Sequence, residues 1–479
     1  MKRIYILILF SSLLTASFPL QGYSIGSETI SNDNTGMIIY AGQSGATMNS
    51  DVYAGGGDDD TEALQAMLDQ ALVLGRLHLV LDGAARISKT LKIHSNTTIE
   101  CLNQSCGLFL SDGSNCSVIM NAEPDLYTIR NRNITLIGGT YNNNSPGQVH
   151  HREEETWNIV SNLVMAMEFY GVEHFTMRDV TIANQRSWAM VMANWKYVTM
   201  ENIHIDRRER QDHQNQDGLH FWGPGRFLTI RDIRGNAGDD FIALAPDEHD
   251  LKSSIEDVLI QGVQLEDADQ GIRLLVRGDG KLDRVVIRDV TGTYRSYGFY
   301  ISPWFSGSGG NYGNIIFDTV DLRPMKNNYD YTPPFLFKLA GNIESITFKN
   351  IYQHTPGYNH EMFLIGGHYV YDHRPDRPVT DQHPTRIGKI IVDGLYIDER
   401  NENGVPNSYF RIKSEVGMLS VNNVILQRAK ELPVKGSLIK MAGGTIGELR
   451  LNNISTQGLE KLIDAQSKDI KVKKIVNAE

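Results

Sequence analysis

A short pattern that recurs about every thirty residues is the feature that most constrains the fold of this chain. Each copy has an apolar residue, any residue, a turn-forming residue and a second apolar residue, inside a run of strand-like alternation. The turn-forming positions are 23 to 31 residues apart, with one spacing of 44. They are Asp179, Asn202, Asp232, Gly262, Asp289, Thr319 (a weaker copy), Asn350, Gly394, Asn423 and Asn453.

This period predicts a β-solenoid, because one such repeat cannot bury its apolar side alone and must stack on its neighbours. Asn, Asp and Gly tolerate the left-handed backbone that a tight turn between strands requires. Helical and leucine-rich solenoids fit poorly, since the strands alternate with period two and no long helices separate them. A β-sandwich would space its strands about 8–12 residues apart without this turn pattern. We therefore predict an all-β chain that forms a single-stranded parallel β-helix.

A second set of strands runs in register with the first. Its members begin at Ser187, Asp217, Asp240, Gln270 and Tyr297. If Leu219, Ile242 and Ile272 point into the core, alternation turns the residue after each of them outward, among them His220 and Arg273. Because neighbouring coils lie about 4.8 Å apart, residues distant in sequence become an adjacent set on one face.

The charge balance limits the partners of the chain, and its N-terminal residues indicate its location. There are 46 Lys and Arg against 57 Asp and Glu, and this acidic balance argues against a nucleic-acid or membrane partner. Lys2 and Arg3 precede a short apolar run that ends near Leu14 and is too short to span a bilayer. We interpret residues 1–24 as a signal peptide, which predicts a secreted or periplasmic protein, and residues 25–479 as the β-helix domain.

A short helix is expected within an N-terminal cap at about residues 50–75. Asp59 can cap it, with Glu62 completing a capping box. The apolar stripe of this helix consists of Leu64, Met67, Leu68, Ala71 and Leu72. A single helix before a solenoid would cover the open end of its core.

The three cysteines, Cys101, Cys106 and Cys116, allow one disulfide at most. Three cysteines with no His at ligand spacing make a poor zinc site. We interpret them as small apolar side chains of the core, and we expect neither a metal nor a cofactor.

Several segments resemble a known family. Gly57 to Asp69 looks like the entry segment of the pectate-lyase-like superfamily of right-handed parallel β-helices. Asn215-Gln-Asp-Gly, Gly238-Asp-Asp and Gly271-Ile-Arg273 resemble, in order and approximate spacing, three of the four motifs of glycoside hydrolase family 28, which contains polygalacturonases. The resemblance extends over about residues 50–460 for the fold, but over only about sixty residues for the chemistry.

The resemblance implies an inverting glycoside hydrolase acting on a polysaccharide or oligosaccharide such as pectin. Asp239 would be the general acid, with Asp217 and Asp240 as bases for the attacking water. Glycoside hydrolysis needs such a pair, and crowded carboxylates raise one another's pKa, which leaves one of them protonated as the acid. The expected substrate contacts are Arg273, His220, His249, Trp188 and Tyr300.

The sequence also departs from the family pattern. The usual Gly-His-Gly turn is absent, His220 stands where an acidic residue often occurs, and Leu275 replaces the Lys of an Arg-x-Lys pair. Arg and Lys together would suit a sugar carboxylate, so the missing Lys argues against ordinary homogalacturonan.

Other readings of the aspartates remain open. They could be turn residues, or ligands of Ca²⁺. Alternative functions are a glycan-binding β-helix without catalysis and a polysaccharide lyase.

Overall fold

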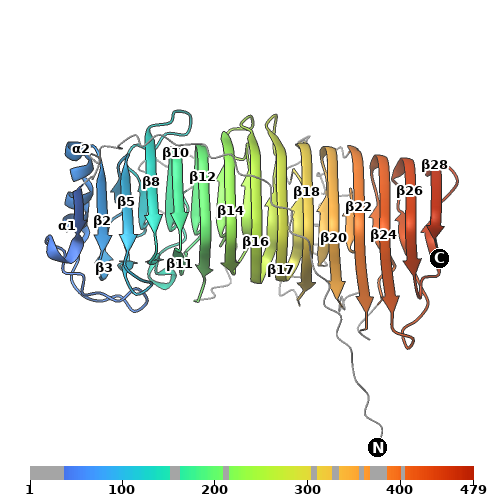
Figure 1. The fold of residues 1–479 in the computed structure, drawn as a ribbon, viewed down its shortest axis with the longest axis horizontal. Helices are drawn as coiled ribbons and strands as arrows, with labels where there is room; N and C mark the ends of the chain where they lie inside the picture. Colours follow the sequence, from blue (N-terminus) through green and yellow to red (C-terminus); the bar gives the residue numbers. More distant parts are fainter. Residues whose placement is uncertain are drawn as a thin grey trace, which may run out of the picture. The chain divides into compact units, whose positions relative to one another are not determined.

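The computed structural model describes residues 37–151, 162–208, 215–303, 310–325, 334–354, 361–366, 386–400 and 405–478. The expected signal peptide, residues 1–24, lies outside these ranges. Residues 36–479 form one compact unit. It is the predicted right-handed parallel β-helix, in which strands of successive coils lie side by side (Figure 1).

The strands form three columns, and the paired strands within each column are parallel. The first column contains β1 (Met37–Tyr40), β2 (Leu77–Leu81), β5 (Thr97–Cys101), β8 (Asn131–Ile137), β10 (Met167–Arg178), β12 (Met190–Asp206), β14 (Gly225–Gly235), β16 (Ile255–Leu274), β17 (Lys281–Ile301), β18 (Asn311–Pro324), β20 (Asn342–His354), β22 (Arg386–Glu399), β24 (Glu415–Arg428), β26 (Thr445–Thr456) and β28 (Ile470–Ala478). The second column contains β4 (Leu91–Ile93), β7 (Ile119–Asn121), β13 (Leu219–Trp222), β15 (Asp240–Ala245), β19 (Phe335–Leu339), β21 (Phe363–Ile365), β23 (Ser408–Ile412), β25 (Ser437–Met441) and β27 (Lys461–Asp464), together with the beginnings of β10 and β12 and the ends of β16 and β17. The third begins with β3 (Ala84–Ile87), β6 (Gly107–Leu110), β9 (Thr140–Asn142) and β11 (Thr181–Ala183) and continues into the end of β12.

The repeat residues turn the chain as predicted. All ten turn-forming positions have positive φ, between 50° at Asn350 and 85° at Gly394. Side-chain amides also join successive coils at these turns, as where Asn202 donates to Asp179 at 2.7 Å. The pattern read from the sequence is therefore the turn that ends one part of each coil.

A second row of left-handed residues was not predicted. It includes His174, Tyr197 and Phe227, whose rings stack on the outside with centroids 4.8 and 5.0 Å apart. Left-handed backbone is unfavourable for such large side chains, and ring stacking offsets part of that cost.

The core is one continuous apolar cluster inside the coils. Leu219, Ile242 and Ile272 pair in register and are fully buried in it, as predicted. The same inward row continues as stacked phenylalanines, with ring centroids 4.9 Å apart between Phe299 and Phe337. The residue that follows each inward residue therefore lies on the outer face.

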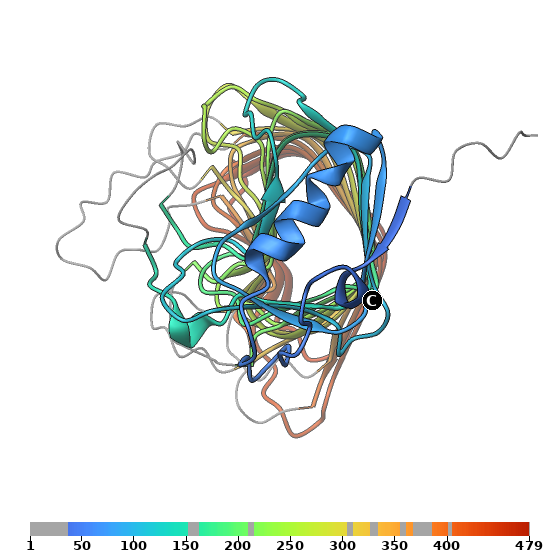
Figure 2. The same ribbon diagram turned by 90° about the vertical axis from the view of Figure 1, so that its left-hand side faces the viewer.

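The N-terminal cap contains α1 (Thr61–Leu68) and α2 (Gln70–Leu74), and α1 lies across the end of the coil stack (Figure 2). The first four predicted stripe residues are buried, but Leu72 is 69% exposed because the helix breaks at Asp69. Asp59 accepts a hydrogen bond from the Thr61 N–H at 3.0 Å, but the N-cap of α1 is Asp60, one residue later than predicted. Glu62 instead pairs with Lys89, so the predicted capping box was wrong.

The three cysteines lie within the described ranges and form no disulfide, and Cys101 and Cys106 belong to the apolar core as predicted. Two short 3-10 turns, η1 (Ala41–Gln43) and η2 (Ser145–Gly147), complete the secondary structure of the described ranges. Among those ranges, none of the helices has the length and apolar character to traverse a bilayer.

Candidate active site

The three aspartates lie at the N-terminal ends of two strands of the second column, on two neighbouring coils. Asp217 precedes β13, and Asp240 is the first residue of β15. The Gly218 N–H donates to the carbonyl of Asp240 at 2.9 Å, and the Gln270 N–H donates to the carbonyl of Asp239 at 3.1 Å. The coil spacing thus brings the two acidic motifs together, with Gln270 on the coil that follows.

Close contacts between coils require the glycines of these motifs. A Cβ at Gly218 would lie 2.3 Å from the carbonyl oxygen of Phe241, and one at Gly271 would lie 2.4 Å from the carbonyl oxygen of Gly298. Backbone atoms of the next coil cannot move away easily. Each glycine therefore lets two coils approach beside a functional side chain.

Burial and crowding change the acidity of the aspartates. Burial, reinforced by the charges of Asp217 and Asp269, raises the pKa of Asp239 to about 8. Burial and the charge of Asp239 also raise the pKa of Asp240 well above its ordinary value. Asp239 therefore holds its proton at neutral pH, and its carboxyl oxygens accept hydrogen bonds from the Asn215 N–H at 3.2 Å and the Gln270 amide at 3.0 Å.

His220 forms a bridge between two carboxyl groups. Its Nδ1 lies 2.7 Å from Asp217 and its Nε2 lies 2.8 Å from Glu248. Burial disfavours the charged ring, but the two carboxyl partners raise the pKa of His220 to about 10, so both ring nitrogens donate at neutral pH. For Asp217, burial raises the pKa, while the hydrogen bond from the imidazolium opposes this and favours the carboxylate.

Aromatic side chains hold this bridge in place. Trp188 stacks on His220 with centroids 3.8 Å apart and an interplanar angle of 2°. The indole N–H of Trp222 donates to Glu248 at 2.9 Å, and Trp222 meets Trp188 edge-on. Sequence reasoning missed Glu248. Its only signal is a position one coil after His220, which many residues of a repeat share.

Arg273 lies in the same outward row as His220, two coils further on. Its guanidinium lies 3.7 Å from the ring centroid of Tyr300. The ring of Tyr297 stacks on Tyr300 with centroids 4.1 Å apart, and the Tyr300 side chain is fully buried. Tyr300 thus supports Arg273 and offers no free ring face to a sugar.

His249 lies apart from the aspartates. Its ring stacks on Trp222 at 5.6 Å and approaches Tyr127 at 6.3 Å, and its Nε2 lies 3.6 Å from Asp250. Burial lowers its pKa, so the ring is neutral at neutral pH. The structure therefore brings together four of the five predicted substrate contacts, namely Arg273, His220, Trp188 and Tyr300. His249 instead packs against Trp222.

The side chains of the site are largely buried beneath the outer face. Asp217, His220 and Arg273 are each 3% exposed, whereas Asp239 and Asp240 are partly exposed. No set of three or more His, Cys, Asp and Glu side chains within the described ranges is arranged to hold a metal ion.

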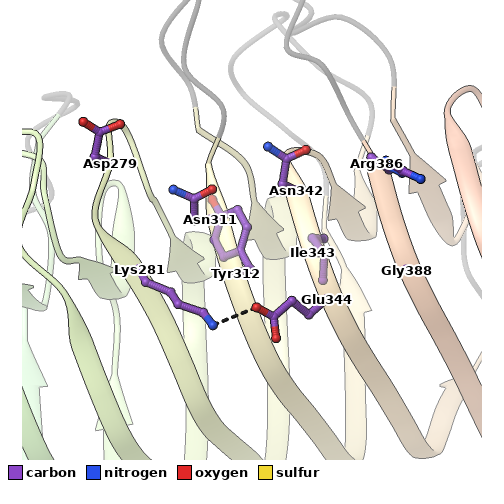
Figure 3. A pocket seen from close by; sticks show the side chains of 9 residues that line it. All are labelled: Asp279, Lys281, Asn311, Tyr312, Asn342, Ile343, Glu344, Arg386 and Gly388. Atoms are coloured by element: carbon purple, nitrogen blue, oxygen red, sulfur yellow. Dashed lines mark hydrogen bonds and ion pairs between the residues drawn. The ribbon is translucent and has the colours of Figure 1, made fainter.

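A separate cavity of 690 Å³ lies where β17, β18, β20 and β22 begin (Figure 3). It contains the ion pair of Lys281 with Glu344, 2.8 Å apart, and none of the three aspartates lines it. The cavity is thus distinct from the carboxyl cluster.

Comparison with known proteins supports the family resemblance. Residues 74–274 match glycosyl hydrolases family 28. The match to family 28 begins in α2 and ends in β16, so it contains all three aspartates and Arg273, and it confirms the resemblance read from the motifs. It supports a glycan-degrading hydrolase. A comparison with curated proteins found no match.

Solved structures show the same fold at low identity. The A-module of the mannuronan C-5 epimerase AlgE4 from Azotobacter vinelandii has a TM-score of 0.52 and 11% identity, covering 91% of this chain and 100% of that chain. A mutant tailspike protein of E. coli bacteriophage HK620, in complex with a pentasaccharide, has a TM-score of 0.51 and 12% identity over 88% of this chain and 75% of that chain. An exopolygalacturonase from Thermotoga maritima has a TM-score of 0.48 and 11% identity over 90% of this chain and 92% of that chain.

Proposed function

We propose that this protein hydrolyses a glycosidic bond of a polysaccharide or oligosaccharide with inversion at the anomeric carbon. The observation that carries the proposal is a pair of carboxyl groups on neighbouring coils, one hydrogen-bonded to a histidine and the other crowded by further carboxylates. Asp239 is an acid with a pKa of about 8, whereas Asp217 accepts a hydrogen bond from an imidazolium. One proton donor and one proton acceptor on a single outer face are what glycoside hydrolysis requires.

In the proposed reaction, Asp239 donates its proton to the glycosidic oxygen as the bond from that oxygen to the anomeric carbon breaks. A water molecule attacks the opposite side of the sugar ring, and Asp217 takes the proton that the water loses. Asp240, whose pKa burial and Asp239 raise well above its ordinary value, keeps its own proton and helps to orient that water. Solvent then returns a proton to Asp239 and removes one from Asp217. Both chemical roles thus use groups of this chain alone.

Neighbouring side chains hold the proposed base, Asp217, and the proposed acid, Asp239, in position. Glu248 and Asp217 hold the His220 ring from both sides, so the ring cannot turn away from Asp217. The Gln270 amide fixes Asp239 from the next coil. Such positioning matters because proton transfer requires close contact between donor and acceptor.

The test is the release of reducing ends from a panel of plant and bacterial polysaccharides, with the first product anomer determined by proton NMR. We expect hydrolysis with inversion, and we expect Asp239→Asn to abolish it in a folded protein. Turnover that is unchanged in Asp239→Asn would remove Asp239 as the acid. Saturable glycan binding without new reducing ends would instead indicate a binding protein, and unsaturated ends absorbing in the ultraviolet would indicate a lyase.

We also propose that the protein is exported, on the basis of the charged and apolar pattern of residues 1–24. N-terminal sequencing of the mature protein from the cell exterior or periplasm tests this. A mature chain that still begins at Met1 would contradict it.

A further inference from the structure

Several polar atoms around the aspartates are buried and have no hydrogen-bond partner within the part of the chain that the structure describes, and three of them bear on the ligand. They are Oδ1 of Asp240, Oε1 of Gln270 and Nε1 of Trp188. Buried polar atoms are normally paired, so these atoms indicate the chemistry of an absent ligand. The two oxygens accept hydrogen bonds, and a sugar hydroxyl can donate to them. A carboxylate has no hydrogen to donate to the amide oxygen of Gln270.

The charges of the site are already matched. Two cations, His220 and Arg273, act on the carboxyl groups of the cluster. These carboxyl groups are Asp217, Asp239, Asp240 and Glu248. Even with two of the four protonated, the remaining two equal the cations in number. A fifth carboxylate, Asp269, lies 4.0 Å from Arg295. A substrate carboxylate would therefore meet no surplus positive charge.

The edge of the site beside Arg273 is apolar. Leu275 lies two residues beyond Arg273 on the outer face, and it belongs to a cluster with Trp222, Ala245 and Trp188. Leu275 is only 5% exposed, so this cluster is well packed. An apolar edge suits the carbon face of a sugar and disfavours a charged group, which would lose its hydration there.

From these three observations we infer that the sugar bound at the aspartates is uncharged: a neutral hexose or deoxyhexose rather than a uronic acid. This inference rests on the proposed function for its place at the cleaved bond. Its ligand chemistry rests separately on the unpaired acceptors, the balanced charges and the apolar edge.

The experiment uses pairs of polysaccharides that differ only in one group. Polygalacturonan and rhamnogalacturonan are each compared with their carboxyl-reduced forms, in which every uronate becomes the corresponding neutral sugar at unchanged linkages. We expect reducing ends to appear at least about tenfold faster from a carboxyl-reduced member than from its acidic parent. Equal or faster hydrolysis of an acidic parent overturns the inference.

A substitution that adds a charge gives a second test of the inference. Leu275→Lys adds a cation beside Arg273, and Leu275→Met, of similar length without charge, is its matched control. We expect Leu275→Lys to shift the preference toward the acidic parent by about tenfold relative to Leu275→Met. An identical preference in the two variants overturns the role of this edge.

Binding separates the inference from the proposed function. Titration calorimetry of the wild-type protein with trigalacturonate and with its carboxyl-reduced trisaccharide needs no turnover. If no polysaccharide is hydrolysed, the proposed function fails, and the inference then stands when the reduced trisaccharide binds more tightly than trigalacturonate. Equal binding, or binding of neither, overturns it. Tighter binding of trigalacturonate overturns the inference whether or not hydrolysis occurs.

Discussion

Replacing Asp239 with Asn should stabilise the fold while it removes the proposed acid. Burial and neighbouring carboxylates raise the pKa of Asp239 from 3.8 to about 8 in the folded protein. Between these pH values the unfolded chain releases the proton while the folded protein keeps it. The free energy of unfolding of the wild type therefore falls by about 1.4 kcal/mol for each pH unit in this window. At pH 7 the accumulated loss is about 4 kcal/mol.

The Asn variant lacks this titration and so avoids the loss. One of its two side-chain contacts, with the Asn215 N–H or with the Gln270 amide, would place two donors together, at a cost of about 1 kcal/mol. We therefore expect a net gain of about 2–3 kcal/mol at pH 7 and no gain at pH 4.

The assay is urea denaturation of both proteins at several pH values from 4 to 8. The sign follows from the raised pKa: the wild type keeps this part of its stability below pH 4 and loses it as the pH approaches 8. The difference between the proteins should therefore grow with pH. A difference that stays constant from pH 4 to pH 8 would refute the reasoning, since it would mean that Asp239 ionises normally in the folded protein.

Three further predictions concern the supports of the site and the coils. In Glu248→Gln, His220 loses one carboxylate partner, so the pKa of His220 should fall from about 10 by about one to two pH units. NMR titration of the imidazole measures this shift. An unchanged pKa of His220 would exclude Glu248 as its partner. Gly218→Ala places a Cβ 2.3 Å from a carbonyl oxygen and should lower the free energy of unfolding by about 2–4 kcal/mol. Gly56 has open space around it, so Gly56→Ala should cost only the roughly 1 kcal/mol of a left-handed backbone. Equal losses in the two variants would contradict the close approach of the coils at Gly218. At Asn202, with φ of 52°, Gly should be tolerated and Val should cost about 1–2 kcal/mol in thermal or urea unfolding; a harmless Val would contradict the left-handed turn.

The coils could be predicted because the sequence repeats the same requirement many times. Every predicted turn position has positive φ, since a tight turn accepts few residue types and the pattern shows them at regular intervals. The outer row with Tyr197 and Phe227 could not be predicted in this way. The left-handed positions of this row are occupied by large residues, which do not signal such a backbone in a sequence. Their side chains stack across coils in the folded protein.

The candidate site was predictable in part, for the same physical reason. The motifs around Asp217 and Asp239 carry glycines that the close approach of two coils demands, so residue identity there records the backbone geometry. Glu248 has no such neighbour, and its role depends on where a turn after β15 returns to His220. Likewise, the stacking of Tyr300 beneath Arg273 follows from side-chain rotamers, which alternation along a strand does not determine.

The described carboxyl cluster draws on little more than two turns of the solenoid, and the coils from β18 onward present their outward residues to the same side of the second column. Evolution could therefore change the length and composition of the glycan that we propose as substrate by altering those distant positions alone. The proton-transfer groups would remain untouched, because each coil contacts only its immediate neighbours.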